Sequence, residues 1–127
     1  MSLADPLSKA PLVRPNIGQY ADEAAALAGV VARLVEALDP QAIWLFGSRA
    51  RGDHRPDSDF DLLVVAKENG GFGSNDYVKA YRATVGLGLD CEVVPCSHED
   101  FEDALTTHTS FVSQIVAHGQ QVFEARP

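Results

Sequence analysis

A tight turn between two short apolar runs constrains this chain more than any other feature. The first run covers residues 42–46 and leads into a glycine-serine turn, and the second covers residues 60–65 and follows a polar loop. Both runs are rich in residues that favour strands. Asp59 and Asp61 stand where the second run begins, and a spacing of two residues on a strand directs both side chains to one face. The pattern therefore predicts two strands that carry a turn and a pair of carboxylates.

The residue types at this turn indicate nucleotide chemistry. Carboxylates such as those of Asp59 and Asp61 are ligands that magnesium prefers, with phosphate and water oxygens completing the shell. Gly47 lets the backbone approach a ligand closely, and Ser48 supplies a hydroxyl and an N–H at a predicted helix start, where anions are favoured. A cradle for phosphate beside metal-binding carboxylates is what a nucleotide and its metal require.

The same residues resemble a known signature. Gly47-Ser48, ten intervening residues and then Asp59-x-Asp61 are similar to the motif of the DNA polymerase β-like nucleotidyltransferase superfamily. The string resembles the minimal nucleotidyltransferase branch of that superfamily in five further positions, namely Arg49, Ala50, Arg51, Gly52 and Ser58. The likeness runs from about Tyr20 to Phe123. It implies a single α/β domain of polymerase β-like fold, with a small mixed sheet flanked by helices.

A third acid is expected on the strand predicted at residues 89–95. Asp90 and Glu92 alternate onto one face of that strand, and an acidic pair in an otherwise apolar strand is costly to bury without a cation. The resemblance implies two magnesium ions held by Asp59 and Asp61, with a third acid, usually Asp, on the corresponding strand. The family spacing favours Glu92 as this ligand, and Asp90 is the alternative. Either acid can take part in catalysis by accepting the proton of an acceptor hydroxyl.

The basic residues near the turn suit a triphosphate. The resemblance assigns Gly47 and Ser48 to the phosphates, and Arg49 or Arg51 to the charge that develops during transfer. A net charge of −8 argues against a surface that grips long nucleic acid, because such a surface needs a basic footprint. Arg55 adds a third cation to the same loop, and a triphosphate needs only a local patch.

The reaction implied by the resemblance is the transfer of a nucleoside monophosphate, AMP from ATP, to an acceptor hydroxyl with release of pyrophosphate. A chain of 127 residues is expected to form one domain, so the acceptor docks on the catalytic domain itself or arrives with a partner. Some minimal nucleotidyltransferases are antitoxins that transfer AMP to a tyrosine of a HEPN-domain toxin, and this interpretation ranks first. One alternative is a transferase for a small molecule such as an aminoglycoside, working as a homodimer. The other is a non-catalytic module that neutralises a toxin by contact.

Apolar residues at three- and four-residue spacing predict helices around the sheet. One helix is expected over residues 16–38. Another is expected over residues 76–87, with Val78, Tyr81 and Val85 facing the core. The C-terminal part is predicted to form two helices and a short last strand, at about residues 97–105, 111–118 and 122–123.

The N-terminal residues and the two cysteines indicate where the domain begins and in which compartment the protein is expected. Residues 1–15 contain three prolines and no periodic apolar pattern, which predicts an extended or disordered arm before a domain at residues 16–127. No apolar run approaches membrane-spanning length, and the core of a signal peptide is missing. Cys91 and Cys96 are expected on opposite faces of one strand, a poor geometry for a disulfide. We therefore predict a cytoplasmic protein with reduced thiols and no membrane partner.

Overall fold

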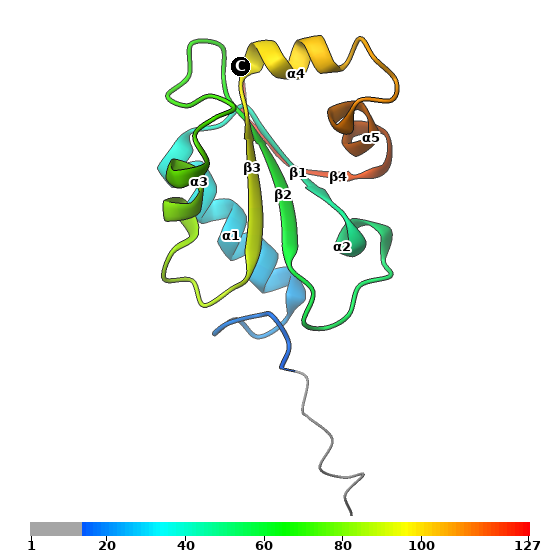
Figure 1. Cartoon of the computed structure of the whole chain (residues 1–127). Helices are drawn as coiled ribbons and strands as arrows, with labels where there is room; N and C mark the ends of the chain where they lie inside the picture. Colours follow the sequence, from blue (N-terminus) through cyan, green and yellow to red (C-terminus); the bar gives the residue numbers. More distant parts are fainter. Residues whose placement is uncertain (1–13) are drawn as a thin grey trace, which may run out of the picture.

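The computed structural model describes residues 14–127, which form a four-stranded sheet between two groups of helices (Figure 1). The elements in chain order are α1 (Glu23–Leu38), β1 (Ala42–Phe46), α2 (Ser48–Arg51), β2 (Phe60–Val65), α3 (Tyr77–Thr84), β3 (Cys91–Cys96), α4 (His98–Ala104), α5 (Phe111–His118) and β4 (Gln120–Glu124). The sheet order is β3-β2-β1-β4, in which β2 and β3 run parallel and the other neighbours are antiparallel. The predicted α/β fold with a small mixed sheet is confirmed. The predicted arm at residues 1–15 lies, apart from its last two residues, outside the described part.

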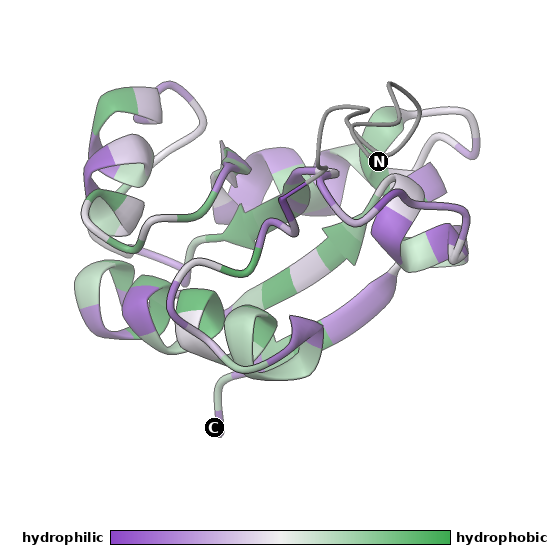
Figure 2. Cartoon of the chain, turned by 90° about the horizontal axis from the view of Figure 1, so that it is seen from below, coloured by the Kyte–Doolittle hydropathy of each residue, from purple (hydrophilic) through white to green (hydrophobic). Residues whose placement is uncertain are grey.

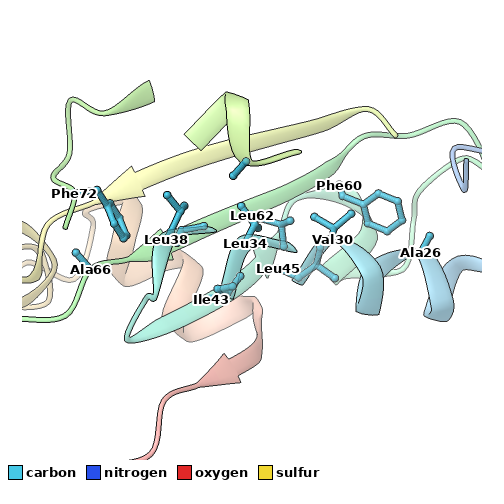
Figure 3. Close-up of a cluster of buried hydrophobic side chains, with 12 residues drawn as sticks. Ala26, Val30, Leu34, Leu38, Ile43, Leu45, Phe60, Leu62, Ala66 and Phe72 are labelled. Atoms are coloured by element: carbon cyan, nitrogen blue, oxygen red, sulfur yellow. The ribbon is translucent and has the colours of Figure 1, made fainter. Parts of the chain in front are cut away.

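Alternation along the two central strands divides the core into two layers. On one face of the sheet, Ile43 and Leu45 of β1 and Leu62 of β2 pack against Val30 and Leu34 of α1 (Figure 3). All five side chains are at most 3% exposed. Figure 2 shows that the strands in the interior are mostly hydrophobic, whereas hydrophobic and hydrophilic residues alternate along the surrounding helices.

The opposite face of the sheet is covered by α5, with α4 beside it. Leu63 and Val65 of β2 lie in a second buried cluster with Val112 and Ile115 of α5. Asp61 belongs to the same alternating set as Leu63, so it points to the α5 face at the end of the sheet where the strand begins. The first carboxylate-bearing strand thus has an apolar side toward α1 and a partly polar side toward α5.

The first helix starts seven residues later than predicted. Asp22 caps α1, because its side chain accepts a hydrogen bond of 2.8 Å from the backbone N–H of Ala25. Tyr20 packs on the core from the turns that precede this cap. Asn16, expected inside the helix, is buried instead, and its backbone N–H donates to the carbonyl of Pro56. The apolar residues at positions 16–22 therefore contact the core, but the backbone there is not helical.

The inward face predicted for α3 is wrong. Val78, Tyr81 and Val85 are 63%, 69% and 52% exposed, whereas Ala80 and Ala83 are buried. The small alanine side chains let α3 pack closely against its neighbours, so the large residues are left on the outer surface. The structure therefore presents an apolar helix face to the solvent.

The remaining differences are small. β3 covers Cys91–Cys96, slightly later than predicted, and the final strand is longer than two residues and pairs with β1. Cys91 and Cys96 pack into opposite layers and are both free thiols, as expected. Ser97 caps α4 by accepting from the N–H of Asp100. Within residues 14–127 we find no helix with the length and apolarity needed to span a bilayer.

Candidate active site

The register of the sheet brings the turn and two acids together. Asp61 is paired with Phe46 of β1 on one side and with Glu92 of β3 on the other. Residues paired across a sheet point to the same face, so the two carboxylates are neighbours. Asp59 lies two residues before Asp61, and Gly47 directly follows Phe46. These residues form the acid cluster of the site, defined as Asp59, Asp61 and Glu92.

Gly47 touches Asp61 directly. The backbone of Gly47 has φ +74°, a conformation that residues with a side chain rarely adopt. A Cβ atom added at this position would collide with Oδ2 of Asp61. Glycine is thus required both by the backbone conformation and by the contact with the carboxylate. The start of α2 and the acid cluster form one continuous surface.

The acid cluster is electrostatically strained. Burial raises the pKa of Asp61 above its usual value, and the charges of Glu92 and Asp59 raise it further, while Arg51 acts in the opposite direction. As the side chains stand in residues 14–127, no three His, Cys, Asp or Glu groups are close enough to hold a metal ion. The donor type nevertheless fits magnesium, which prefers carboxylate oxygens, and a cation would relieve the crowding of like charges. The donor chemistry of these residues therefore suits the metal that the resemblance implies.

The peptide group that precedes Asp59 is held by several donors at once. The Ser58 carbonyl accepts from Nε and Nη2 of Arg49, at 3.1 and 2.8 Å, and from Nδ2 of Asn16 at 3.0 Å. Asn16 also binds the backbone of Asp90 in both directions, donating to its carbonyl and accepting from its N–H, each at 2.8 Å. Asn16 and Arg49 thus fix the backbone next to two of the candidate acids. Sequence reasoning missed Asn16 because its partners are 42 and 74 residues away.

Arg49, in α2, is buried. It is only 5% exposed, donates to the Pro56 carbonyl at 3.1 Å, and forms an ion pair of 3.0 Å with Glu23 of α1. Its guanidinium also stacks over the Phe60 ring, 4.1 Å from the centroid. The guanidinium of Arg49 is therefore committed to protein atoms. The residue joins α1, α2 and the loop that leads to Asp59.

Arg51 is the arginine that remains at the surface. Its side chain is 59% exposed and forms an exposed ion pair of 3.2 Å with Asp53. Its charge lowers the pKa of Asp61, so it acts on the acid cluster. Two arginines in one short helix therefore have opposite environments, which the sequence could not distinguish.

Asp90 and Glu92 occupy different parts of the site. Glu92 is exposed and level with Asp61 in the sheet register. Asp90 lies one pleat earlier, where its carbonyl accepts from the N–H of Phe60. Asp90 and Asp59 together line a cavity of about 330 Å³ beside α3. Both acids considered for the third position are thus close to the site, one next to Asp61 and one next to Asp59.

The thiol of Cys91 lies close to these acids but is not activated. Burial raises its pKa to about 11, and the negative charges of Asp59, Asp90 and Asp61 add to the effect. At neutral pH the group is a protonated thiol, so it is a poor nucleophile and a poor metal ligand.

Comparison with known proteins gives consistent matches. The sequence profile of the family described as nucleotidyltransferase domain matches residues 27–122. A protein of Methanocaldococcus jannaschii, provisionally named a protein adenylyltransferase, is 30% identical over 78 residues, which are 61% of this chain and 74% of that protein.

Solved structures share the fold. A provisionally named nucleotidyltransferase from Sulfolobus solfataricus superposes with a TM-score of 0.52 and 19% identity, over 77% of each chain. A toxin–antitoxin structure with AMP-PNP superposes with a TM-score of 0.55 and 21% identity, over 78% of this chain and 73% of that chain. At such identities the likeness concerns the arrangement of helices and strands.

Proposed function

The chain is an enzyme of the nucleotidyltransferase domain family, and on that premise we propose that it transfers AMP from ATP to a hydroxyl of a partner protein, the toxin of a toxin–antitoxin pair. The observation that carries this proposal is the strained acid cluster in contact with the Gly47 turn. The relative named as a protein adenylyltransferase supports a protein acceptor. The toxin–antitoxin structure with AMP-PNP supports an adenine nucleotide and a toxin partner. We place this toxin in the HEPN-domain class, following the resemblance of the motif, and the pair in the cytoplasm.

The acid cluster is the proposed magnesium site. We assign Asp59, Asp61 and Glu92 as the metal ligands. Magnesium, when bound, supplies positive charge that offsets the negative charge on the phosphates during displacement. The raised pKa of Asp61 supports this assignment, because a carboxylate surrounded by like charges gains most from a cation.

The turn is the proposed phosphate site. Gly47 and Ser48 offer backbone N–H groups and a hydroxyl, and the contact between Gly47 and Asp61 keeps the phosphates beside the acid cluster. Arg51, exposed and close enough to act on Asp61, is the cation that we assign to the departing pyrophosphate. Arg49 and Asn16 position Asp59 by holding the Ser58 carbonyl.

The transfer itself is a displacement at the α-phosphorus of ATP. The oxygen of the acceptor hydroxyl forms a bond to this phosphorus as the bond to the bridging oxygen of the β-phosphate breaks. Pyrophosphate leaves, and the hydroxyl proton passes to the carboxylate of Glu92 or Asp90. The product is a phosphodiester between AMP and the acceptor residue.

The experiment is a binding and transfer assay with a double substitution, Asp59→Asn with Asp61→Asn. Magnesium with ATP at about 100 times its Kd should stabilise the wild-type protein by about 2.7 kcal/mol. The double variant should lose this thermal shift and all detectable release of pyrophosphate. A matched control, Glu102→Gln with Asp103→Asn, removes the same charge from the exposed face of α4 and should keep both signals.

The acceptor is identified in the same assay by mass spectrometry of a candidate partner after incubation with ATP. A mass increase of one AMP on the toxin supports the proposal. Binding of the toxin without release of pyrophosphate would instead indicate a module that neutralises it by contact. An unchanged thermal shift in the double variant would place the nucleotide site elsewhere.

A further inference from the structure

We propose that the acceptor binds at the cavity between α3 and the start of β3, and that it is a protein segment that surrounds its hydroxyl with apolar and positively charged side chains. This inference rests on the proposed function and adds the surface and the acceptor chemistry. The cavity of about 330 Å³ is lined by Asp59 of the acid cluster, by Asp90, and by Tyr81 and Val85 on the α3 side. It therefore joins a candidate catalytic acid to a helix that otherwise has no part in the site.

The order of the strands places this cavity on the correct side for the chemistry. Gly47, at the end of β1, lies on one side of Asp61, and Glu92 on β3 lies on the other. The attacking and leaving oxygens of a phosphoryl displacement are roughly in line through the phosphorus. If pyrophosphate departs on the side of the turn, the acceptor must approach from the side of β3. The cavity lies at that edge of the sheet, because Asp90 and Cys91 at the start of β3 line it together with Asp59.

An exposed apolar surface follows α3, whose residues Tyr81 and Val85 also line the cavity. Within residues 14–127, six large hydrophobic side chains are exposed, and four of them belong to this segment: Tyr77, Val78, Tyr81 and Val85. Tyr77, Tyr81 and Val85 are spaced by four residues, so they follow one side of the helix direction. Exposed apolar patches of this kind mark interaction sites, and tyrosine is enriched among the residues that dominate protein interfaces. The surface is suited to a protein and is larger than a small acceptor molecule needs.

The charge of the cavity selects the acceptor. Its lining contains two carboxylates, Asp59 and Asp90, and no lysine or arginine among the described residues. The whole chain carries a net charge of −8. A nucleic-acid acceptor would bring phosphates against these carboxylates, whereas a segment with lysine or arginine near its hydroxyl complements them. The acceptor is therefore a cationic protein segment.

The test uses two synthetic peptides, each with a single tyrosine next to leucine. In one peptide the other residues are lysine, and in its twin glutamate replaces every lysine. With labelled ATP and magnesium, the wild-type enzyme should modify the lysine peptide with a kcat/KM at least about tenfold above that of its twin. The double variant Tyr81→Ser with Val85→Ser should raise KM for the lysine peptide about tenfold. The Kd for ATP should stay unchanged, because these residues do not contact the turn.

Leu105→Ser is the matched control, since Leu105, at the C-terminal cap of α4, is 39% exposed and does not line the cavity, so it should change none of these values. Transfer to the lysine peptide that is unaffected by Tyr81→Ser with Val85→Ser would overturn the acceptor site while leaving the transferase function intact. ATP binding without transfer to either peptide would also overturn it. A protein that does not bind ATP with magnesium would instead refute the proposed function, so the two failures are distinguishable.

Discussion

On one side of Asp59 and Asp61, the backbone is held by a buried arginine and a buried asparagine. A glycine on the same side lies in van der Waals contact with Asp61. On the other side, α3 turns tyrosine and valine side chains to the solvent beside a cavity. The first side is the turn with its following loop, residues 47–58, together with Asn16, and we call it the nucleotide side. The second is α3 with the loop into β3, residues 77–90, and we call it the acceptor side.

This difference follows from what each side has to bind. The phosphates of ATP have the same shape in every turnover, so a preorganised surface lowers the cost of placing them. The Ser58 carbonyl shows this preorganisation, since three donor atoms from Arg49 and Asn16 converge on it. A protein acceptor must dock and then leave, and exposed apolar side chains without internal partners suit such a reversible contact. The rigid nucleotide side therefore suits ATP, and the exposed acceptor side suits a protein substrate.

The largest effect is expected where the nucleotide side is broken. Arg49→Ala removes a buried guanidinium with its hydrogen bonds to two carbonyls and its stacking on Phe60, and should lower the free energy of unfolding by about 3 kcal/mol. Arg51→Ala removes an exposed ion pair and an exposed charge near Asp61, and should cost less than about 0.5 kcal/mol. Urea unfolding of both variants measures the difference.

The conservative change Arg49→Lys sharpens the same comparison. Lysine keeps the charge but cannot reproduce the planar fork that reaches the carbonyls of Ser58 and Pro56. It should recover less than half of the stability lost in Arg49→Ala. Equal costs for Arg49→Ala and Arg51→Ala would mean that the nucleotide side is not held by the buried network.

The parts of this site that the sequence predicts are those that depend on local pattern. Alternating apolar residues and the spacing of Asp59 and Asp61 predict two strands and a shared face, because strand periodicity is a local property. The contact between Gly47 and Asp61 follows from the register that those strands adopt. The mixed sheet and the helices around it could therefore be predicted from the sequence.

The parts that escaped prediction depend on distant contacts. Nothing near Asn16 in the sequence indicates that it clamps Ser58 and Asp90, because both partners arrive from other elements. The inward face of α3 was misassigned because two different stripes of that helix satisfy a helical period, and the choice between Tyr81 and Ala80 is made by the closeness of neighbouring elements. Tertiary packing decided both cases.

The next largest effect is on turnover, and it depends on whether Glu92 or Asp90 is the third acid of the site. Side chains at i and i+2 lie about 6.5 Å apart along a strand, so only one of Asp90 and Glu92 can be level with Asp61. The register gives that place to Glu92. Glu92→Gln should lower turnover about a hundredfold and leave the affinity for ATP largely intact, because Asp59 and Asp61 remain. Asp90→Asn should lower turnover about threefold and act mainly through KM for the lysine peptide, a loss of order tenfold or less.

Steady-state kinetics and ATP titration of both variants separate these outcomes. A larger loss of turnover in Asp90→Asn than in Glu92→Gln would identify Asp90 as the catalytic acid. The acceptor side would then contribute a residue to the reaction itself. Two harmless substitutions would favour a non-catalytic role for the acid cluster. Glu102→Gln, on the exposed face of α4, serves as the control for loss of one negative charge.

The smallest effect is a pH dependence of stability at the place where the two sides meet. Burial and the charges of Glu92 and Asp59 raise the pKa of Asp61 above its ordinary value of 3.8, so the folded protein holds this proton more tightly than the unfolded chain does. The contribution of Asp61 to stability is complete below about pH 3.8 and is lost as the pH rises through the folded pKa. Without metal, Asp61→Asn should therefore raise the Tm by about 2 °C at pH 7, and this gain should vanish toward pH 4. Magnesium with ATP should reverse the order, because only the wild-type carboxylate gains from the cation. If Asp61→Asn were less stable than the wild type at pH 7 without metal, the attraction of Arg51 for the Asp61 carboxylate would exceed the repulsion from Glu92 and Asp59. The negative charges of the acid cluster would then be compensated before any nucleotide binds.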